Sequence, residues 1–247
     1  MESYGSLASV YDAFTEDVQY EKRADFVEKL LHKSGKAVHT VLDLACGTGT
    51  MTALFAARGY EMIGVDASEE MLLIAREKMQ GAGGIPPLFL HQTMQKLDLY
   101  GTVDAAFCSL DSLNYLLRER DVRRTFERLH LFIAPGGALV FDVHGIAKME
   151  AMDEQVFLDE REDAYCLWRT FYRRRSRMLD YEVDLFRRRG DVWERDFEEH
   201  HQRGYTVEEL TAWLRAAGFA DIRTFGDCRM RRAKPDEGRI YFYCVRK

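Results

Sequence analysis

Over the first 150 residues, short apolar blocks alternate with stretches in which apolar residues recur every three or four positions. Such blocks are typical of buried strands, and the recurrent spacing is typical of helices that cover a core. Strands are expected at residues 38–44, 62–65, 88–90, 103–108 and 138–143, and helices at 18–32, 48–58, 69–80 and 121–132. Because alternating strands and helices build a parallel sheet with helices on both faces, the pattern predicts a doubly wound, mostly parallel α/β fold.

The pattern changes after about Glu150. Between residues 155 and 203, apolar and charged residues alternate, which is the period of a strand with one buried face. Gly190 and Asp191 separate two such runs, at a position suited to a hairpin turn. This part of the chain is therefore expected to be an inserted antiparallel β-sheet.

The last part of the chain returns to the first pattern. Thr206 and Glu209 have the spacing of a capping box, and Gly218 follows the helix that they begin. Two strands are expected after it, at 222–225 and 240–245. We therefore expect a cofactor-binding core at 1–150, a substrate cover at 151–204, and a segment at 205–247 that completes the core sheet.

Composition narrows the class of protein. Hydrophobic residues make up 47% of the chain and charged residues 31%, as in ordinary globular domains. The net charge of -6 argues against a nucleic-acid backbone as the main partner, because phosphates are bound mainly by Lys and Arg. The five scattered cysteines and the absence of a long apolar stretch predict a cytoplasmic protein without disulfides or a membrane span. A monomer or a homodimer is expected.

The segment V-L-D-L-A-C-G-T-G-T, residues 41–50, is a strand that enters a glycine turn and opens a helix. Glycines at 47 and 49 allow a bound molecule to approach the backbone, and open parallel sheets bind ligands at this edge. A dinucleotide fingerprint has a third glycine at the position of Thr52. The departure favours a nucleoside without a pyrophosphate.

An acidic residue ends the next strand. In the segment I-G-V-D-A-S, residues 63–68, Asp66 stands at the end of the predicted strand, where a carboxylate can accept both hydrogen bonds of a ribose diol. Together with the I-A-P-G-G segment at 133–137, expected to be a turn, these motifs resemble the class I S-adenosylmethionine methyltransferases, in particular the branch that acts on small molecules. The resemblance extends over about residues 38–145, and it implies S-adenosylmethionine as the cofactor.

The resemblance also implies a set of cofactor contacts. The methionine end would lie against the glycine turn, the ribose against the second strand end, and the adenine between the helix after it and the residues after the third strand. Ser109 and Leu110 would lie under the sulfonium, and Asp111, Asn114 and Tyr115 at the mouth of the pocket. The remaining implied residues are Asp43, Ala45, Cys46, Gly47, Gly49, Asp66, Ala67, Met71, Thr93 and Met94. Met71 is equally consistent with a place in the helix core.

The acceptor side is less defined by the sequence. Tyr11 suits a lid over the cofactor or a contact between the first helix and the sheet. If the acceptor loses a proton, the candidate bases are His144 at the end of the fifth strand, and Glu198 or His200 in the inserted sheet. Residues 198–201 resemble a metal cluster, but alternate residues of a strand point to opposite faces, so no metal is predicted.

Three functions remain open at this stage. The first is methyl transfer to a small-molecule acceptor. The second is RNA methylation, with the arginines at 173–175 and 187–189 as the RNA contacts, although acidic residues are interleaved with them. The third is a protein that binds S-adenosylmethionine without catalysis.

Overall fold

The computed structural model describes residues 7–81 and 83–247, and it contains two separate sheets. The seven-stranded sheet has the order β10-β11-β5-β4-β1-β2-β3, and the four-stranded sheet has the order β6-β7-β8-β9. The strands are β1 (Thr40–Leu44), β2 (Glu61–Asp66), β3 (Leu88–His91), β4 (Val103–Cys108), β5 (Ile133–His144), β6 (Gln155–Arg161), β7 (Ala164–Arg173), β8 (Met178–Arg189), β9 (Val192–Arg203), β10 (Phe219–Phe225) and β11 (Arg239–Arg246). The helices are α1 (Tyr11–Phe14), α2 (Tyr20–Leu31), α3 (Thr50–Ala57), α4 (Glu69–Lys78), α5 (Glu119–Phe132), α6 (Ile146–Ala151) and α7 (Val207–Ala216).

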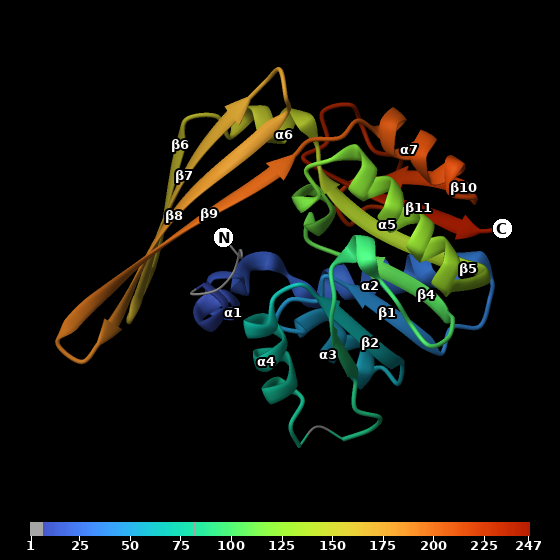
Figure 1. The fold of residues 1–247 in the computed structure, drawn as a ribbon, viewed down its shortest axis with the longest axis horizontal. Coiled ribbons are helices and arrows are strands. Elements are labelled where there is room, and N and C mark those ends of the chain that lie inside the picture. The colour runs from blue at the N-terminus through green and yellow to red at the C-terminus, as the bar shows by residue number, and fades with distance from the viewer. Residues whose placement is uncertain (1–6, 82) are drawn as a thin grey trace.

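Helices cover both faces of the large sheet (Figure 1). Apolar residues of α5 and α7 pack with one set of alternating strand residues, and those of α2 and α3 pack with the opposite set. The strands β1 to β5 are parallel, and β11 pairs with β5 in the antiparallel direction. The doubly wound α/β prediction is confirmed. In the sheet, β2 and β3 lie on one side of β1, and the chain then returns to place β4 on the other side of β1. In open α/β sheets, ligands bind at the carboxyl ends of the strands where the order reverses in this way, here β1 and β4.

The sequence signals for the ends of helices are present in the structure. The Ser68 hydroxyl accepts a hydrogen bond from the Met71 amide at the start of α4, and Thr206 with Glu209 forms a complete capping box. Gly35 and Gly218 have positive φ values of 76° and 102°, which end helical segments where other residues would be strained.

The predicted turn at 134–137 differs from the structure. These residues lie within β5, as an irregular stretch where the pairing with β4 shifts between Val103 and Ala105. A Cβ on Gly137 would lie 2.3 Å from the carbonyl oxygen of Asp104, so β4 approaches too closely for any other residue. The Pro-Gly-Gly sequence therefore forms a bulge that is held by the neighbouring strand.

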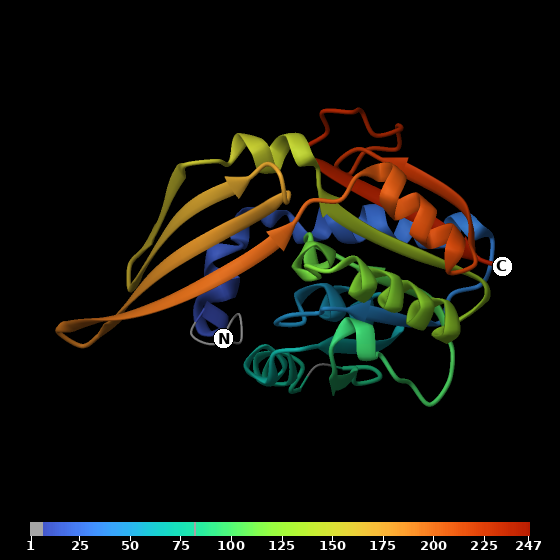
Figure 2. The ribbon, with the colours of Figure 1, turned by 45° about the horizontal axis from the view of Figure 1, so that its top comes forward.

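The four-stranded sheet extends away from the core, and the N-terminal segment lies beneath it (Figure 2). All its neighbouring strands are antiparallel, and Gly190 and Asp191 connect β8 to β9, as predicted. Leu179, Val183 and Leu185 of β8 are almost fully buried on one face. That face packs against Leu7 and Phe14, among other residues. Among the described residues, no helix has the length and apolarity needed to cross a bilayer.

Candidate cofactor and acceptor site

A cavity of about 320 Å³ lies at the carboxyl ends of β1, β2 and β4, a size within the range of small-molecule sites. Eleven of the residues predicted from the sequence line it, namely Tyr11, Asp43, Ala45, Cys46, Gly47, Asp66, Ala67, Met71, Met94, Ser109 and Leu110. The lining also includes Tyr20, Thr48, Thr50, Met51, Val65, Ser68, Gln92, Ser112 and Tyr115. Gly49 and Thr93 are not part of it. Of the three residues expected at the mouth of the pocket, Tyr115 lines the cavity, whereas Asp111 and Asn114 form hydrogen bonds behind it. The predicted cofactor residues therefore meet around one cavity, except Gly49 and Thr93.

The two glycines of the turn have different roles. Gly47 has a φ of 54° and faces open space, so its backbone is accessible from the cavity. Gly49 has a φ of 74°, and a Cβ there would lie 2.9 Å from the Cβ of Ala75 in α4. Gly49 is thus required by the close packing of α4 on the turn. This explains why it does not line the cavity, although the spacing of the motif suggested a ligand contact.

Asp66 connects the second strand end to the glycine turn. Its Oδ2 accepts a hydrogen bond of 2.8 Å from the Gly47 amide, and its Oδ1 accepts one of 2.9 Å from the Ser68 amide. Burial raises the pKa of Asp66, and the donating amides oppose that rise. Each carboxylate oxygen keeps a second acceptor site, so the pair can also receive the two hydroxyls of a ribose.

Asp43 lines the cavity and is 1% exposed. Its Oδ2 accepts a hydrogen bond of 2.6 Å from the hydroxyl of Thr52. Burial raises the pKa of Asp43 to about 7, although the Thr52 hydrogen bond opposes the rise. Thr52, which marked the departure from a dinucleotide fingerprint, therefore supports a buried carboxylate whose charge a cationic ligand would stabilise.

The opposite end of the cavity is mostly apolar. Met71 is 2% exposed and still lines the cavity, so it combines the two roles that the sequence left open. Met94 and Gln92 follow β3 at this end. The hydroxyl of Thr93 lies between them in the chain, and it is buried without a hydrogen-bond partner among the described residues. Since Thr93 does not line the cavity, its hydroxyl is not accessible from the cavity in this structure.

The loop after β4 is held in an unusual conformation. Leu110 and Asp111 have φ values of 58° and 51°, a region that non-glycine residues enter at a cost of about 1–2 kcal/mol each. Both amides donate to the carboxylate of Asp142 in β5, over 2.9 Å and 3.0 Å. Arg239 of β11 forms an ion pair with the same carboxylate. The pair Asp142–Arg239 therefore fixes the loop that borders the cavity.

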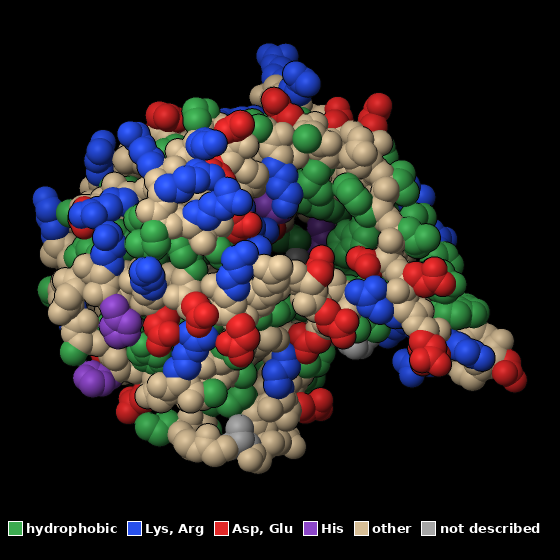
Figure 3. Space-filling model, turned by 180° about the vertical axis from the view of Figure 1, so that it is seen from behind, with side chains coloured by type: hydrophobic (Ala, Val, Ile, Leu, Met, Phe, Trp, Pro, Cys, Tyr) green, Lys and Arg blue, Asp and Glu red, His purple; other side chains and the backbone are tan. Residues whose placement is uncertain are grey.

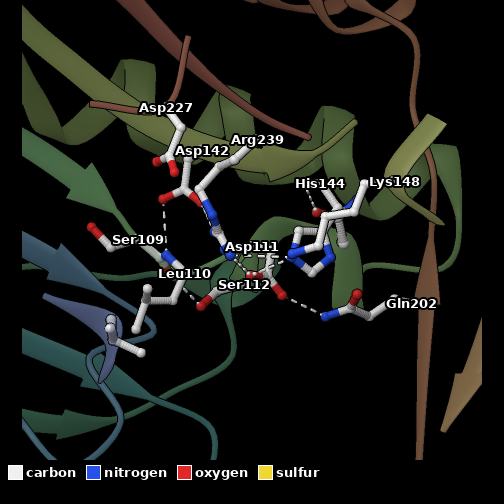
Figure 4. A network of polar contacts seen from close by, with 12 residues as sticks. Ser109, Leu110, Asp111, Ser112, Asp142, His144, Lys148, Gln202, Asp227 and Arg239 are labelled. Atoms are coloured by element: carbon white, nitrogen blue, oxygen red, sulfur yellow. Dashed lines mark hydrogen bonds and ion pairs between the residues drawn. The ribbon is translucent and has the colours of Figure 1, made fainter. Parts of the chain in front are cut away.

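Behind this loop, a polar network connects the core to the inserted sheet (Figure 4). Asp111 accepts hydrogen bonds from Arg239 over 2.6 Å and from the side-chain amide nitrogen of Gln202 over 2.7 Å. His144 Nε2 lies 3.2 Å from Asp111 and 2.9 Å from Lys148 Nζ. Burial lowers the pKa of His144 to about 4; Asp111 opposes this effect, and the positive charges of Arg239 and Lys148 add to it. His144 is therefore a neutral member of this network and does not line the cofactor cavity.

Glu198 and His200 lie on the inner face of β9. His200 is 1% exposed, and its Nε2 lies 3.2 Å from the Glu198 carboxylate, whose other oxygen accepts a hydrogen bond of 2.9 Å from the Leu7 amide. The His200 ring meets the edge of Tyr115 at a centroid distance of 6.1 Å. Since Tyr115 lines the cavity, His200 lies one side chain away from it. His201 points to the other face and pairs with Asp180.

Some lining residues were not found from the sequence. The hydroxyl of Thr48 donates to Asp12 over 2.6 Å, and the ammonium of Lys78 lies 2.8 Å from the same carboxylate. These contacts fasten the N-terminal segment to the glycine turn and bring Tyr11 over the cavity. The position of Thr48 inside the motif was a signal that could have identified it. Tyr20 has no such signal, because its place depends on how α2 packs.

Comparison with known proteins agrees with this geometry. A family model described as "Methyltransferase domain" matches residues 41–137. The chain is 34% identical over 241 residues to "Putative methyltransferase YqeM" of Bacillus subtilis (strain 168), covering 97% of this chain and 95% of that protein.

Solved structures extend the similarity over the inserted sheet. A S-adenosylmethionine-dependent methyltransferase from Clostridium acetobutylicum ATCC 824 superposes with a TM-score of 0.88 at 24% identity, covering 99% of each chain. The structure of SAM-bound CalS10, an amino pentose methyltransferase from Micromonospora echinaspora, superposes with a TM-score of 0.76 at 22% identity, covering 96% of this chain and 97% of that one. The chain belongs to the Rossmann-like, class I S-adenosylmethionine-dependent methyltransferases.

Proposed function

We propose that this enzyme transfers a methyl group to a small molecule bound between the cofactor cavity and the inserted sheet. The observation that carries the proposal is the position of the cavity, which Tyr11 of the N-terminal segment borders and which Tyr115 alone separates from His200 on the inner face of the sheet. A site enclosed in this way accommodates a compact acceptor and excludes water from the reacting atoms.

S-adenosylmethionine supplies a methyl group that its sulfonium has already activated. The residues of the cavity fit this cofactor, because the carboxylates of Asp43 and Asp66 line it together with the apolar side chains of Met71 and Met94. We assign Asp43 to the methionine end, Asp66 to the ribose hydroxyls, and Met71, Thr93 and Met94 to the surroundings of the adenine. Ser109 and Leu110 would lie next to the sulfonium. The chain then has mainly to align the acceptor in line with the bond that breaks.

Among the three candidate bases, the geometry favours His200. His144 is held by Arg239, Lys148 and Asp111 behind the loop, and its lowered pKa makes it a weak base. His200 lies beside the cavity, and Glu198 would stabilise its imidazolium after proton transfer. We propose His200 as the base, with Glu198 as the residue that orients it.

The arginines of the inserted sheet support a small acceptor over RNA. Four of the six arginines at 173–175 and 187–189 form ion pairs with acidic residues of the same sheet or its turns, namely Arg173, Arg187, Arg188 and Arg189. Paired guanidinium groups are less available to phosphates. The amino pentose methyltransferase CalS10, which shares this architecture, is also named for a small acceptor.

Transfer of a labelled methyl group tests the proposal. The enzyme is incubated with methyl-labelled S-adenosylmethionine and a cell extract separated by ultrafiltration into small molecules and macromolecules. We expect label in a compound of the small-molecule fraction, and loss of that label with His200→Asn. Label in the RNA of the other fraction would establish the rival enzyme function. Cofactor binding without transfer to either fraction would indicate a protein that binds S-adenosylmethionine without catalysis.

A further inference from the structure

A second cavity, of about 500 Å³, lies on the other side of the Asp111–His144–Arg239 network from the cofactor. Five basic and two acidic residues line it, namely Lys22, Arg23, Lys148, Arg229 and Arg239 with Asp227 and Glu237. In Figure 3, Lys and Arg side chains gather on the core beside the hollow that separates it from the inserted sheet. The cavity therefore combines a concave shape with an excess of positive charge.

The two acidic residues already have partners. Asp227 pairs with Arg23 over 3.0 Å, and Glu237 pairs with Arg231, which lies outside the cavity lining. Arg239 is likewise occupied by Asp111 and Asp142. Within the described part of the chain, no ion pair involves Lys22, Lys148 or Arg229. Three cations are thus left in one cavity without a carboxylate of their own.

Lys148 is the least exposed of these three cations, and Figure 4 shows it beside His144. It projects from α6, and its ammonium donates to His144 Nε2 over 2.9 Å. Since Arg239 also donates to this nitrogen, His144 accepts as a neutral imidazole and does not balance the charge. Burial and the neighbouring Arg239 lower the pKa of Lys148, and the more distant carboxylates of Asp111 and Asp227 oppose this effect without forming an ion pair with it. A partly desolvated ammonium whose hydrogen-bond acceptor is neutral is unfavourable, and an anion in the cavity would stabilise it.

We propose that this cavity binds an oxyanion, the phosphate or carboxylate group of a small molecule. Lys148 makes the inner contact, and Lys22 and Arg229 close over the ligand from the rim. Charge-assisted hydrogen bonds from three cations are the interactions that oxyanions form most strongly. The site does not depend on methyl transfer, because it lies outside the cofactor cavity and requires none of the residues assigned to the reaction.

Isothermal calorimetry with inorganic phosphate tests the proposal on the full chain, with malonate in a parallel titration and ionic strength held constant. We expect saturable binding of at least one of these anions. Lys148→Met should weaken it about tenfold or more, the loss expected for one charge-assisted hydrogen bond. Lys36→Met is the matched control, because it removes the same charge from a lysine that pairs with Asp104 at the opposite end of the sheet. Its affinity should equal that of the wild type.

A double variant protects the test against misfolding of Lys148→Met. Lys22→Met with Arg229→Met alters exposed residues at the rim and should weaken binding several-fold in a protein that still binds S-adenosylmethionine. Absence of saturable binding of both anions to the wild type would overturn the proposal. So would equal affinity in the wild type, Lys148→Met and the double variant. Binding of S-adenosylmethionine, measured in parallel, reports separately on the proposed cofactor site.

Discussion

At the scale of single residues, Asp66 offers the most direct test of the cofactor site. Asp66→Ala should raise the dissociation constant for S-adenosylmethionine by a factor equivalent to about 1–3 kcal/mol, because the ribose loses a charged acceptor. Calorimetry measures the change. Asp191→Ala is the control, since it removes a carboxylate from the hairpin turn between β8 and β9. Unchanged affinity in Asp66→Ala would refute the ribose contact.

Asp43 allows a prediction in which stability and binding change in opposite directions. Its folded-state pKa of about 7 lies above the value of 3.8 expected for an unfolded chain, so between these values the native state holds a proton that the unfolded state has lost. The carboxyl therefore reduces the free energy of unfolding progressively as the pH rises from about 4 to 7, with no further loss above 7.

In Asp43→Asn this loss disappears, and the oxygen that accepts from Thr52 is retained. We expect the stability of the variant relative to the wild type to increase from pH 4 to 7, by up to about 4 kcal/mol, and then to remain constant. Its affinity for the cationic cofactor should fall. Urea unfolding across this range and calorimetry at pH 8 measure the two effects. A stability difference that is independent of pH would contradict the raised pKa.

The sequence predicted residues well where a motif fixes both the backbone and the side chain. Gly47 and Asp66 belong to strand ends whose edge of the sheet is determined by topology, and both line the cavity. Two predicted cofactor contacts, Gly49 and Thr93, do not line the cavity, and each has a physical reason. Gly49 is required by the Cβ of Ala75 in α4, a contact between elements that no local spacing contains. Thr93 lies outside the lining with its hydroxyl buried, a matter of side-chain direction in a non-repetitive segment.

At the scale of elements, the loop after β4 depends on β5 and β11. Asp142 is 0% exposed, and its carboxylate holds the Leu110 and Asp111 amides as well as Arg239. Asp142→Asn leaves Arg239 with Asp111 as its remaining carboxylate partner and removes the charged acceptor of two loop amides, so it should lower the free energy of unfolding by about 1.5–3 kcal/mol. Denaturant unfolding measures this loss.

The matched control is Asp196→Asn, which breaks a partly exposed pair with Arg187 in the inserted sheet. Its effect should be below about 1 kcal/mol, the usual value for pairs near the surface. Similar losses in the two variants would show that the loop does not depend on the buried pair. The pair between Asp142 and Arg239 could not be predicted from the sequence. The two residues lie 97 positions apart and meet only through the antiparallel register of β5 and β11.

Periodicity was sufficient to predict the strands and the longer helices, whereas the short helices α1 and α6 were not predicted. The alternation of Leu179, Val183 and Leu185 with charged residues gave both the strand and its buried face, and Gly190 with Asp191 gave the hairpin. It did not predict the bulge at 134–137. Gly-rich segments have the local composition of a turn, and only the approach of Asp104 in β4 keeps this one within the strand.

At the scale of the whole molecule, the two sheets have separate tasks in the proposed function. The core holds the cofactor, and the inserted sheet brings His200 to the acceptor. His200→Asn should therefore leave the affinity for S-adenosylmethionine unchanged, because His200 does not line the cofactor cavity. Methyl transfer to the small-molecule fraction should fall by about 10²–10⁴-fold, the usual contribution of a general base.

The neighbouring histidine provides the control for this last prediction. His201 lies on the same strand, but successive residues point to opposite faces, and it pairs with Asp180 away from the cavity. His201→Asn should retain both binding and transfer. Equal losses of transfer in the two variants would mean that β9 acts only through its folding. Loss of cofactor binding in His200→Asn would mean that the two sheets are not separable in this way, since a base on the inserted sheet has no direct contact with the glycine turn or with Asp66.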